Sequence, residues 1–284
     1  MEEIIMICNV KDIPIYYEEY GKGKPVMCIH GYTLDHNMTK GCLEPIFSKT
    51  DGYRRIYIDL PGMGKTPSSP WIRKSEDMLE LVTEFINALI PNENFLVLGQ
   101  SYGGYLTLGL ICKMAYRIDG VVLLCPLITY KSVPDTDCFI SGILPEKRIL
   151  LKSEDLEQHE NNPDVNDFLE YAVIATPEVF ERYQAEIQPG IKIADKDFLF
   201  SYFKGYSHDY EDMLKTVKFD KPACIITGRQ DHGAGYTYAY ELLDKFPRAT
   251  YAVLDCGGHN LQIENEPLFS QLVKDWLWRM NLTE

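Results

Sequence analysis

Short apolar runs alternate with amphipathic stretches along most of the chain. The apolar runs that predict buried strands are residues 25–29, 55–59, 95–98, 120–124, 222–227 and 250–254. The stretches with apolar residues at helical spacing are 75–90, 102–115, 236–246 and 266–280. Ser75 is placed to be the N-cap of the first of these helices. Strands that alternate with helices pair in parallel through crossover connections, so the pattern predicts a doubly wound α/β domain.

The beginning and the middle of the chain depart from this alternation. Residues 3–8 and 13–20 predict two strands joined at 9–12, an antiparallel hairpin at a sheet edge. From Pro126 to Leu214 the chain is polar, with aromatic residues at no strand-like period, and its pieces 165–175 and 177–187 predict short helices. We therefore predict a core formed by residues 1–125 and 215–284, with residues 126–214 inserted as a helical lid.

Composition and charge narrow the class of protein. Of the 284 residues, 45% are hydrophobic and 25% charged, which is ordinary for a globular protein. The formal net charge of −14 argues against a nucleic acid or an anionic membrane surface as partner. The N-terminus lacks the features of a signal peptide, and no apolar run approaches the roughly 20 residues that span a bilayer. The eight cysteines are dispersed without a CxxC pair, so we expect reduced thiols and a cytoplasmic location.

Residues suited to acyl transfer follow three of the predicted strands, at the edge where open parallel sheets bind ligands. Ser101 stands in Gly99-Gln-Ser-Tyr-Gly103, where glycines permit a sharp turn from strand to helix. His259 follows the last predicted strand, and Asp231 follows the strand before it. A serine becomes nucleophilic when a base takes its proton and an acid orients that base. We interpret Ser101, His259 and Asp231 as these three groups.

Acyl transfer also needs donors for the oxyanion that forms on the substrate. The backbone N–H groups of Tyr102, just after Ser101, and of Tyr32, just after His30-Gly31, are the candidates. Each residue of the site also has a simpler interpretation. The serine–glycine stretch is a common turn, Asp231 could cap helix 236–246, Asp255 is a competing acid, and His259 could be a structural histidine.

Taken together, the motifs resemble those of the α/β-hydrolase fold family. They are Gly-Gln-Ser101-Tyr-Gly-Gly, His30-Gly31, Asp59-Leu-Pro-Gly-Met-Gly64, Gly228-Arg-Gln-Asp231 and Gly258-His259, in the family's order. The chain is most similar to the lidded, cofactor-free branch with carboxylesterases, carbon–carbon bond hydrolases, prolyl aminopeptidases and perhydrolases. The resemblance implies a mostly parallel eight-stranded sheet, a lid after the sixth strand, and no cofactor or metal. The serine excludes the aspartate-nucleophile branches, and the lipase-type HGGG stretch is absent from the sequence.

These observations predict a serine hydrolase that cleaves a small, fairly apolar ester through an acyl-enzyme. A carbon–carbon bond hydrolase or an aminopeptidase with the same residues is the first alternative, and a ligand sensor with slow turnover is the second. We expect a small-molecule substrate, no nucleic-acid or membrane partner, and a monomer or homodimer.

Several other residues have expected roles. His30 would hold the oxyanion loop in shape, while Asp59 and Pro61-Gly62 would build a turn. His36, His159, His208 and His232 match no metal-binding spacing and are expected on the surface or in the lid. The aromatic residues of 126–214 either line an apolar pocket over Ser101 or form the lid's own core. The basic residues that would meet a substrate carboxylate, or only decorate the surface, are Lys131, Lys147, Arg148, Lys152 and Arg182. Packing accounts for Cys125.

Overall fold

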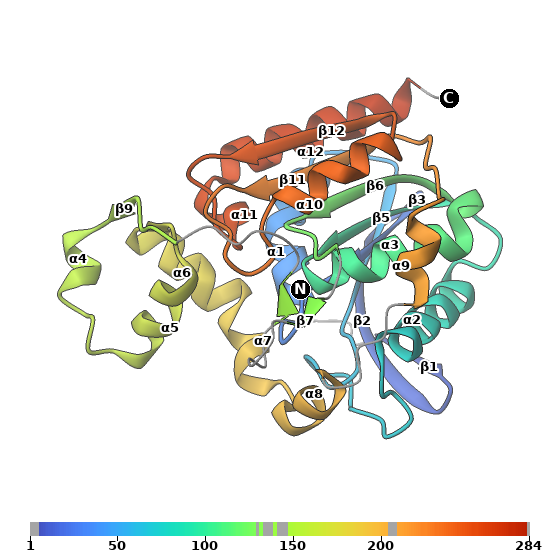
Figure 1. Ribbon diagram of the computed structural model, residues 1–284. Helices are drawn as coiled ribbons and strands as arrows, with labels where there is room; N and C mark the ends of the chain where they lie inside the picture. The colour runs from blue at the N-terminus through green and yellow to red at the C-terminus, as the bar shows by residue number, and fades with distance from the viewer. Residues whose placement is uncertain (1–5, 129–130, 133–138, 141–146, 204–208, 283–284) are drawn as a thin grey trace.

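The computed structural model describes residues 6–128, 131–132, 139–140, 147–203 and 209–282. Its eight-stranded sheet has the order β1-β2-β4-β3-β5-β6-β11-β12 (Figure 1). The strands are β1 (Met6–Val10), β2 (Ile13–Gly21), β3 (Lys24–Ile29), β4 (Tyr53–Ile58), β5 (Phe95–Gln100), β6 (Ile118–Leu124), β11 (Ala223–Gly228) and β12 (Ala249–Leu254). β2 pairs antiparallel with β1 and β4, and every other pairing in this sheet is parallel. The predicted fold is confirmed.

The burial of the strands follows their place in the sheet. β5 and β11, in the interior of the sheet, are buried at every residue, as their continuous apolar runs predict. β1 lies at the edge and alternates between more and less exposed positions. The hairpin turn is tighter than the sequence suggested, because Lys11 and Asp12 alone connect β1 to β2, with φ of 48° and 65°. Two positive φ angles in a two-residue turn match the twist of the flanking strands.

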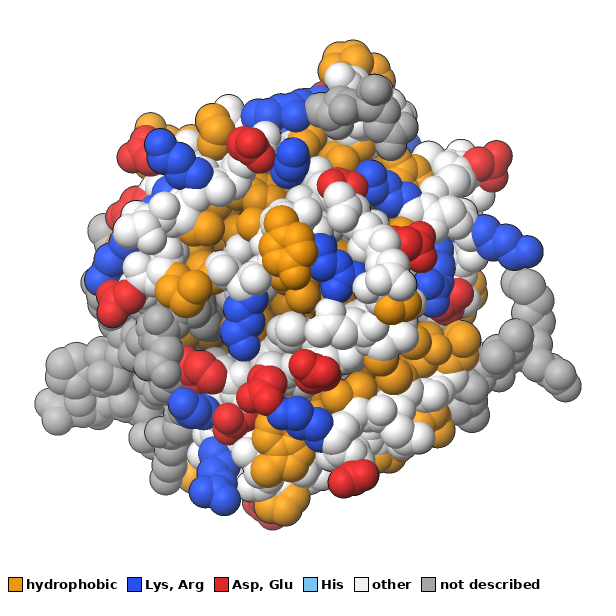
Figure 2. Space-filling view, turned by 90° about the vertical axis from the view of Figure 1, so that its right-hand side faces the viewer, with side chains coloured by type: hydrophobic (Ala, Val, Ile, Leu, Met, Phe, Trp, Pro, Cys, Tyr) orange, Lys and Arg blue, Asp and Glu red, His pale blue; other side chains and the backbone are white. Residues whose placement is uncertain are grey.

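Helices cover both faces of the sheet. One hydrophobic core lies between the sheet and the helices α2 (Ser75–Leu89) and α3 (Tyr102–Met114). A second core lies between the opposite face and the helices α1 (His36–Phe47) and α12 (Glu266–Asn281). None of the helices in the described ranges is both long and apolar enough to cross a bilayer. On the face drawn in Figure 2, acidic and basic side chains are interspersed.

Two predicted helical features need correction, and one helix was missed. Ser75 is not an N-cap: Lys74 has that place, and the Asp77 carboxylate accepts hydrogen bonds from the N–H groups of Arg73 and Lys74. The predicted helix 236–246 is only α10 (Thr237–Tyr240) followed by a 3-10 turn at Glu241–Asp244. α1 was not predicted at all.

The chain between β6 and β11 contains the predicted insertion, residues 126–214. Its described elements are β7 (Lys131–Ser132), β8 (Phe139–Ile140), β9 (Leu151–Lys152), α4 (Glu154–Glu157), α5 (Pro163–Tyr171), β10 (Ile174–Ala175), α6 (Pro177–Glu186), α7 (Gln188–Ile193), α8 (Lys196–Phe203) and α9 (Asp209–Leu214). In Figure 1, β9, α4 and α5 lie to one side of the sheet. The predicted helix 165–175 ends at Tyr171, because the chain then enters the short strand β10.

Candidate active site

Ser101 occupies a sharp turn between β5 and α3. Its φ of 53° and ψ of −114° lie outside the conformations that L-residues ordinarily adopt. The turn is tight enough to require neighbouring glycines: a Cβ on Gly103 would stand 2.1 Å from the carbonyl oxygen of Ile29, and one on Gly99 would stand 2.3 Å from that of Gly103. Strained backbone of this kind is concentrated at functional sites. The structure therefore contains the strand-to-helix turn that the sequence predicted around this serine.

Asp231 and His259 form a hydrogen-bonded pair. The distance between His259 Nδ1 and Asp231 Oδ1 is 3.0 Å, and Asp231 is wholly buried. The same oxygen accepts hydrogen bonds from the N–H groups of Gly233 and Ala234, at 2.8 and 3.0 Å. Asp231 therefore stabilises the loop to which it belongs. It does not cap α10, because that helix begins at Thr237, after the residues that donate to Asp231. The competing acid, Asp255, has an exposed side chain.

The two members of this pair shift each other's pKa. Burial alone would raise the pKa of Asp231, but His259 and the two backbone donors outweigh it and hold the pKa below its ordinary value. Burial alone would lower the pKa of His259, but the charge and hydrogen bond of Asp231, with a smaller effect of Glu264, raise it. A histidine held in this way is oriented and has a stabilised charged form, as a general base requires.

Ser101 is linked to this pair through its neighbour Gln100. Among the described residues, Ser101 Oγ and His259 make no hydrogen bond. The residue before the serine makes the contact instead, since Gln100 Nε2 lies 3.4 Å from His259 Nε2. The Gly31 loop also packs here, because a Cβ on Gly31 would be 3.2 Å from Ser101 Cβ and 2.1 Å from Gln100 Oε1. Sequence reasoning missed Gln100, although it lies inside the serine motif.

The rings of Tyr32 and Tyr102 are in contact. They meet edge to face with centroids 6.1 Å apart. Tyr102 is the first residue of α3, where N–H groups have no acceptor within the helix and point at incoming anions. The Tyr32 hydroxyl donates to the carbonyl of Leu199 in α8 at 2.5 Å, so the loop that carries Tyr32 is tied to the insertion.

His30 and Asp59 have the expected structural places. His30 is wholly buried; its Nδ1 lies 2.7 Å from the carbonyl of Gly31, and its Nε2 accepts from the N–H of Leu60 at 3.0 Å. Burial lowers the pKa of His30, which favours the neutral ring that these two bonds require. The Asp59 carboxylate accepts from the N–H of Lys65 at 2.8 Å and so closes the turn that follows it.

The expectation for His36 was wrong. Its side chain is buried between two carboxylates, with Nδ1 2.9 Å from Asp59 and Nε2 2.9 Å from Glu18. Burial alone would lower the pKa of His36, but the two carboxylates raise it to about 9. His36 is therefore a charged residue of the core, at the beginning of α1.

The other three histidines differ from one another. His159 is exposed, as expected, and His208 lies outside the described residues. His232 is half-buried beside Asp231, and its ring stacks on that of Tyr171 at 5.3 Å.

Three aromatic residues of the insertion pack on one another. Phe168 lies 5.2 Å from Phe180 and 5.3 Å from Tyr183, ring centre to ring centre, and these rings join the hydrophobic core on the α1 and α12 side of the sheet. Phe198 differs, since it packs against the loop after β4, where a Cβ on Gly62 would stand 2.3 Å from its ring. The side chains of Tyr202 and Phe203 lie outside the described residues.

The basic residues of the insertion are largely engaged elsewhere. Arg182 forms an ion pair with Glu186 at 2.6 Å, and Lys152 pairs with Glu160. Lys147 donates to the carbonyl oxygens of Leu169 and Glu170. Arg148 is exposed, and the side chain of Lys131 lies outside the described residues.

Cys125 lies behind the aspartate–histidine pair. Its thiol is wholly buried at the end of β6, with Sγ 3.6 Å from the carbonyl of Gly258, and burial raises its pKa. Ligand atoms of Cys125, Asp231 and His259 lie within 4.8 Å of one another, so these residues could hold a soft metal ion. An ion there would have to replace the hydrogen bond between Asp231 and His259.

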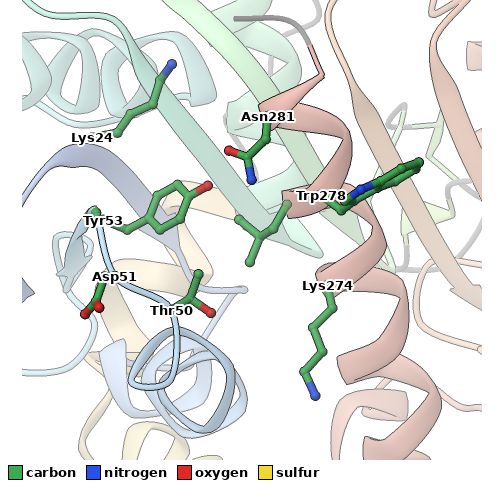
Figure 3. A pocket seen from close by; sticks show the side chains of 9 residues that line it. Lys24, Thr50, Asp51, Tyr53, Lys274, Trp278 and Asn281 are labelled. Atoms are coloured by element: carbon green, nitrogen blue, oxygen red, sulfur yellow. The ribbon is translucent and has the colours of Figure 1, made fainter.

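A surface pocket of 420 Å³ lies away from this site. Lys24, Tyr53, Lys274 and Trp278 are among its lining residues (Figure 3). Lys24 and Tyr53 begin β3 and β4, so the pocket is at the amino ends of the strands. Ser101, Asp231 and His259 follow the carboxyl ends, where this class of sheet binds its ligands.

Comparisons with known proteins agree with the fold. The family model for the alpha/beta hydrolase fold matches residues 24–266. An alpha/beta superfamily hydrolase from Oenococcus oeni PSU-1 is 32% identical, with a TM-score of 0.85 and coverage of 94% of this chain and 96% of that one. A thermophilic esterase from Thermogutta terrifontis is 19% identical, with a TM-score of 0.71 and 99% of each chain covered.

A curated relative is a hydrolase named for dicarboxylate substrates. The 2-hydroxy-6-oxononadienedioate/2-hydroxy-6-oxononatrienedioate hydrolase of Paraburkholderia phymatum is 23% identical over 279 residues, which cover 94% of this chain and 91% of the relative. The family model spans most of the chain, and the site residues stand in the family's order. The protein is therefore a hydrolase that belongs to the α/β-hydrolase fold family.

Proposed function

We propose that this hydrolase cleaves a small, fairly apolar ester through a covalent acyl-enzyme. Ser101 is the nucleophile, His259 the base and then the acid, and Asp231 the residue that orients His259. The backbone N–H groups of Tyr32 and Tyr102 receive the oxyanion. The observation that carries the proposal is the hydrogen bond of 3.0 Å between His259 and the buried Asp231, at the sheet edge where Ser101 stands in a strained turn.

The proposed reaction has two halves. Ser101 Oγ bonds to the substrate's carbonyl carbon while its proton passes to His259 Nε2, and the carbonyl oxygen becomes the oxyanion. The bond to the alcohol oxygen then breaks, and His259 returns the proton to that oxygen. Water, deprotonated by His259, attacks the acyl-enzyme in the same way, which releases the carboxylic acid and restores the serine.

In the resting structure the Gln100 amide occupies the contact with His259 Nε2. The reaction therefore requires His259 or the Ser101 hydroxyl to rotate, so that Oγ and Nε2 meet. Catalytic hydrogen bonds commonly tighten only in the complex with substrate.

An ester is favoured over a diketone acid because basic side chains of the insertion are already paired. The carbon–carbon bond hydrolases among the relatives are named for substrates that carry carboxylates, and such substrates call for a cationic partner. Arg182 and Lys152 are already paired with Glu186 and Glu160. Carbon–carbon bond hydrolysis by the same residues is the second candidate, favoured by that relative's name.

Reaction with a fluorophosphonate tests the proposal, because the reagent labels only an activated serine. We expect one adduct by intact mass, located on Ser101 by peptide mapping and absent from Ser101→Ala and His259→Ala. Esters of increasing acyl length, then a vinylogous diketone acid, would follow. Absence of an adduct from the folded wild-type protein, or ester hydrolysis retained by Ser101→Ala, would overturn it.

A further inference from the structure

The carboxylate of Glu264 joins two parts of the chain that meet beside His259. Its Oε2 accepts a hydrogen bond of 2.6 Å from the N–H of Gly258, the residue immediately before His259. Its Oε1 accepts a second bond of 2.6 Å from the N–H of Val173, in the insertion between α5 and β10. Both oxygens of one side chain are therefore committed, one to the histidine loop and the other to the insertion.

The segments that Glu264 connects are also in close contact. A Cβ on Gly258 would stand 2.9 Å from the side chain of Val173 and 3.1 Å from the carbonyl of Tyr171, so the histidine loop needs a glycine here. Glu264 ends the short helix α11 (Leu261–Glu264), and Arg182 of α6 donates to the carbonyl of Gln262 in the same helix. The insertion thus contacts the histidine loop at Gly258 and the helix α11 at Gln262, both next to Glu264.

Glu264 also adds to the electrostatic environment of His259. Burial raises the pKa of Glu264 more than its backbone donors lower it. The charge of Glu264 raises the pKa of His259, second to the effect of Asp231. The other charged or titratable groups that interact electrostatically with Glu264, or with His232 beside Asp231, are Lys147, Glu170, Cys125 and Cys256.

We propose that Glu264 is a positioning residue for the hydrolase reaction. Glu264 holds the loop of His259 against the insertion, so that the imidazole can reach Ser101. The inference rests on the proposed role of His259 as the base. An amide cannot replace the carboxylate without loss, because its NH₂ group would face a backbone N–H, donor against donor. A displacement of about 1 Å at a catalytic group is enough to slow a reaction on the order of 100-fold.

Two variants separate the position of Glu264 from its charge. Glu264→Gln removes the charge and one acceptor, and Glu264→Asp keeps the charge on a side chain too short to reach both donors. Glu44→Gln is the matched control, because Glu44 is a half-buried carboxylate that accepts from Arg55 and Tyr57 and lies on α1, outside the site. For each protein, the acylation rate with a fluorophosphonate and the kcat for p-nitrophenyl acetate are measured against pH, alongside a thermal melt.

We expect both Glu264 variants to acylate on the order of 10-fold to 100-fold more slowly, with the loss in kcat rather than in KM. The acidic limb of the pH–rate profile should move to lower pH in Glu264→Gln and stay in place in Glu264→Asp. Glu44→Gln should change only the melting temperature. Folded Glu264→Gln with the wild-type rate and profile would overturn the inference alone. If Glu264→Gln does not fold, a wild-type rate in Glu264→Asp overturns it. Failure of the wild-type protein to react would overturn the proposed function and this inference together.

Discussion

Gln100 Nε2 lies 3.4 Å from Nε2 of His259, the ring nitrogen that does not bond Asp231. The amide is wholly buried, and its oxygen lies toward Gly31. A donor beside Nε2 favours the neutral imidazole and holds the nitrogen away from the Ser101 hydroxyl. In the free enzyme, the Gln100 amide thus occupies the position beside His259 Nε2 that the Ser101 hydroxyl must take during the reaction.

Replacing Gln100 with Met should therefore move the acidic limb of kcat/KM to higher pH, since Met has a similar volume and no N–H donor. Fluorophosphonate labelling over pH measures the shift. A limb at lower pH would mean that the amide oxygen, not the NH₂ group, faces the ring.

The pH dependence of activity should reflect the pair of Asp231 and His259. His259 must be neutral to act as a base, and its pKa is raised, so kcat/KM should rise with pH through a midpoint above the ordinary imidazole value. Asp231→Asn removes the charge that stabilises the imidazolium. That variant should lower the midpoint and reduce kcat by about 10⁴-fold, the size of loss that an orienting acid supplies elsewhere. An Asp231→Asn enzyme with wild-type turnover on a cleaved ester would refute the assignment.

Two substitutions of Ser101 should differ in stability while both abolish activity. Ser101→Ala keeps a Cβ in a backbone with φ of 53°, whereas Ser101→Gly relieves that strain. Turnover should fall by about 10⁶-fold in each if the three residues act as a unit. Urea unfolding should show Ser101→Gly more stable than Ser101→Ala by about 1 kcal/mol. Equal stabilities would show that the turn is not strained at this residue.

The buried His36 should make the stability of the fold depend on pH. Its pKa is raised to about 9, so its contribution is complete below the unfolded value of about 6.5 and is lost as pH rises through about 9. The shift corresponds to a contribution on the order of 3 kcal/mol. Urea unfolding at pH 6 and at pH 9.5 should show a larger fall in the wild type than in His36→Gln. Parallel pH dependences in the two proteins would contradict this.

Arg182 offers a test of the substrate class. It is held by Glu186 and by the carbonyl of Gln262. Arg182→Met should reduce thermal stability but leave the KM for a neutral ester within about 2-fold, because the guanidinium has no part in binding it. A large rise in the KM for a diketone acid, with ester hydrolysis unchanged, would instead favour the carbon–carbon bond hydrolase.

The features that could be predicted from the sequence are those that depend on residues close together in the chain. The strands follow from apolar runs, and the candidate site follows from motifs placed at strand ends. Asp231 and His259 are 28 residues apart in sequence, yet the parallel pairing of β11 with β12 brings their loops together.

The parts that could not be predicted depend on contacts between distant elements. α1 contains Gly41 and Pro45, which weaken a helical pattern, and its stability comes from packing on the sheet. The charge of His36 comes from Glu18 and Asp59, which lie on other segments. The contact of Glu264 with Val173 spans 91 residues, and no local motif marks it.

The bond from the Tyr32 hydroxyl to Leu199 has a consequence for protein engineering. Tyr32, whose backbone N–H is one of the two proposed to receive the oxyanion, is also held to α8 through its hydroxyl group. α7 also presses on the same loop, where a Cβ on Gly190 would stand 2.6 Å from the amide nitrogen of Asp35. A chimera in which residues 126–214 are replaced by those of another hydrolase would therefore also need the loop of residues 30–36 from that hydrolase. The loop and the insertion would thus have to be exchanged together, although they are far apart in the sequence.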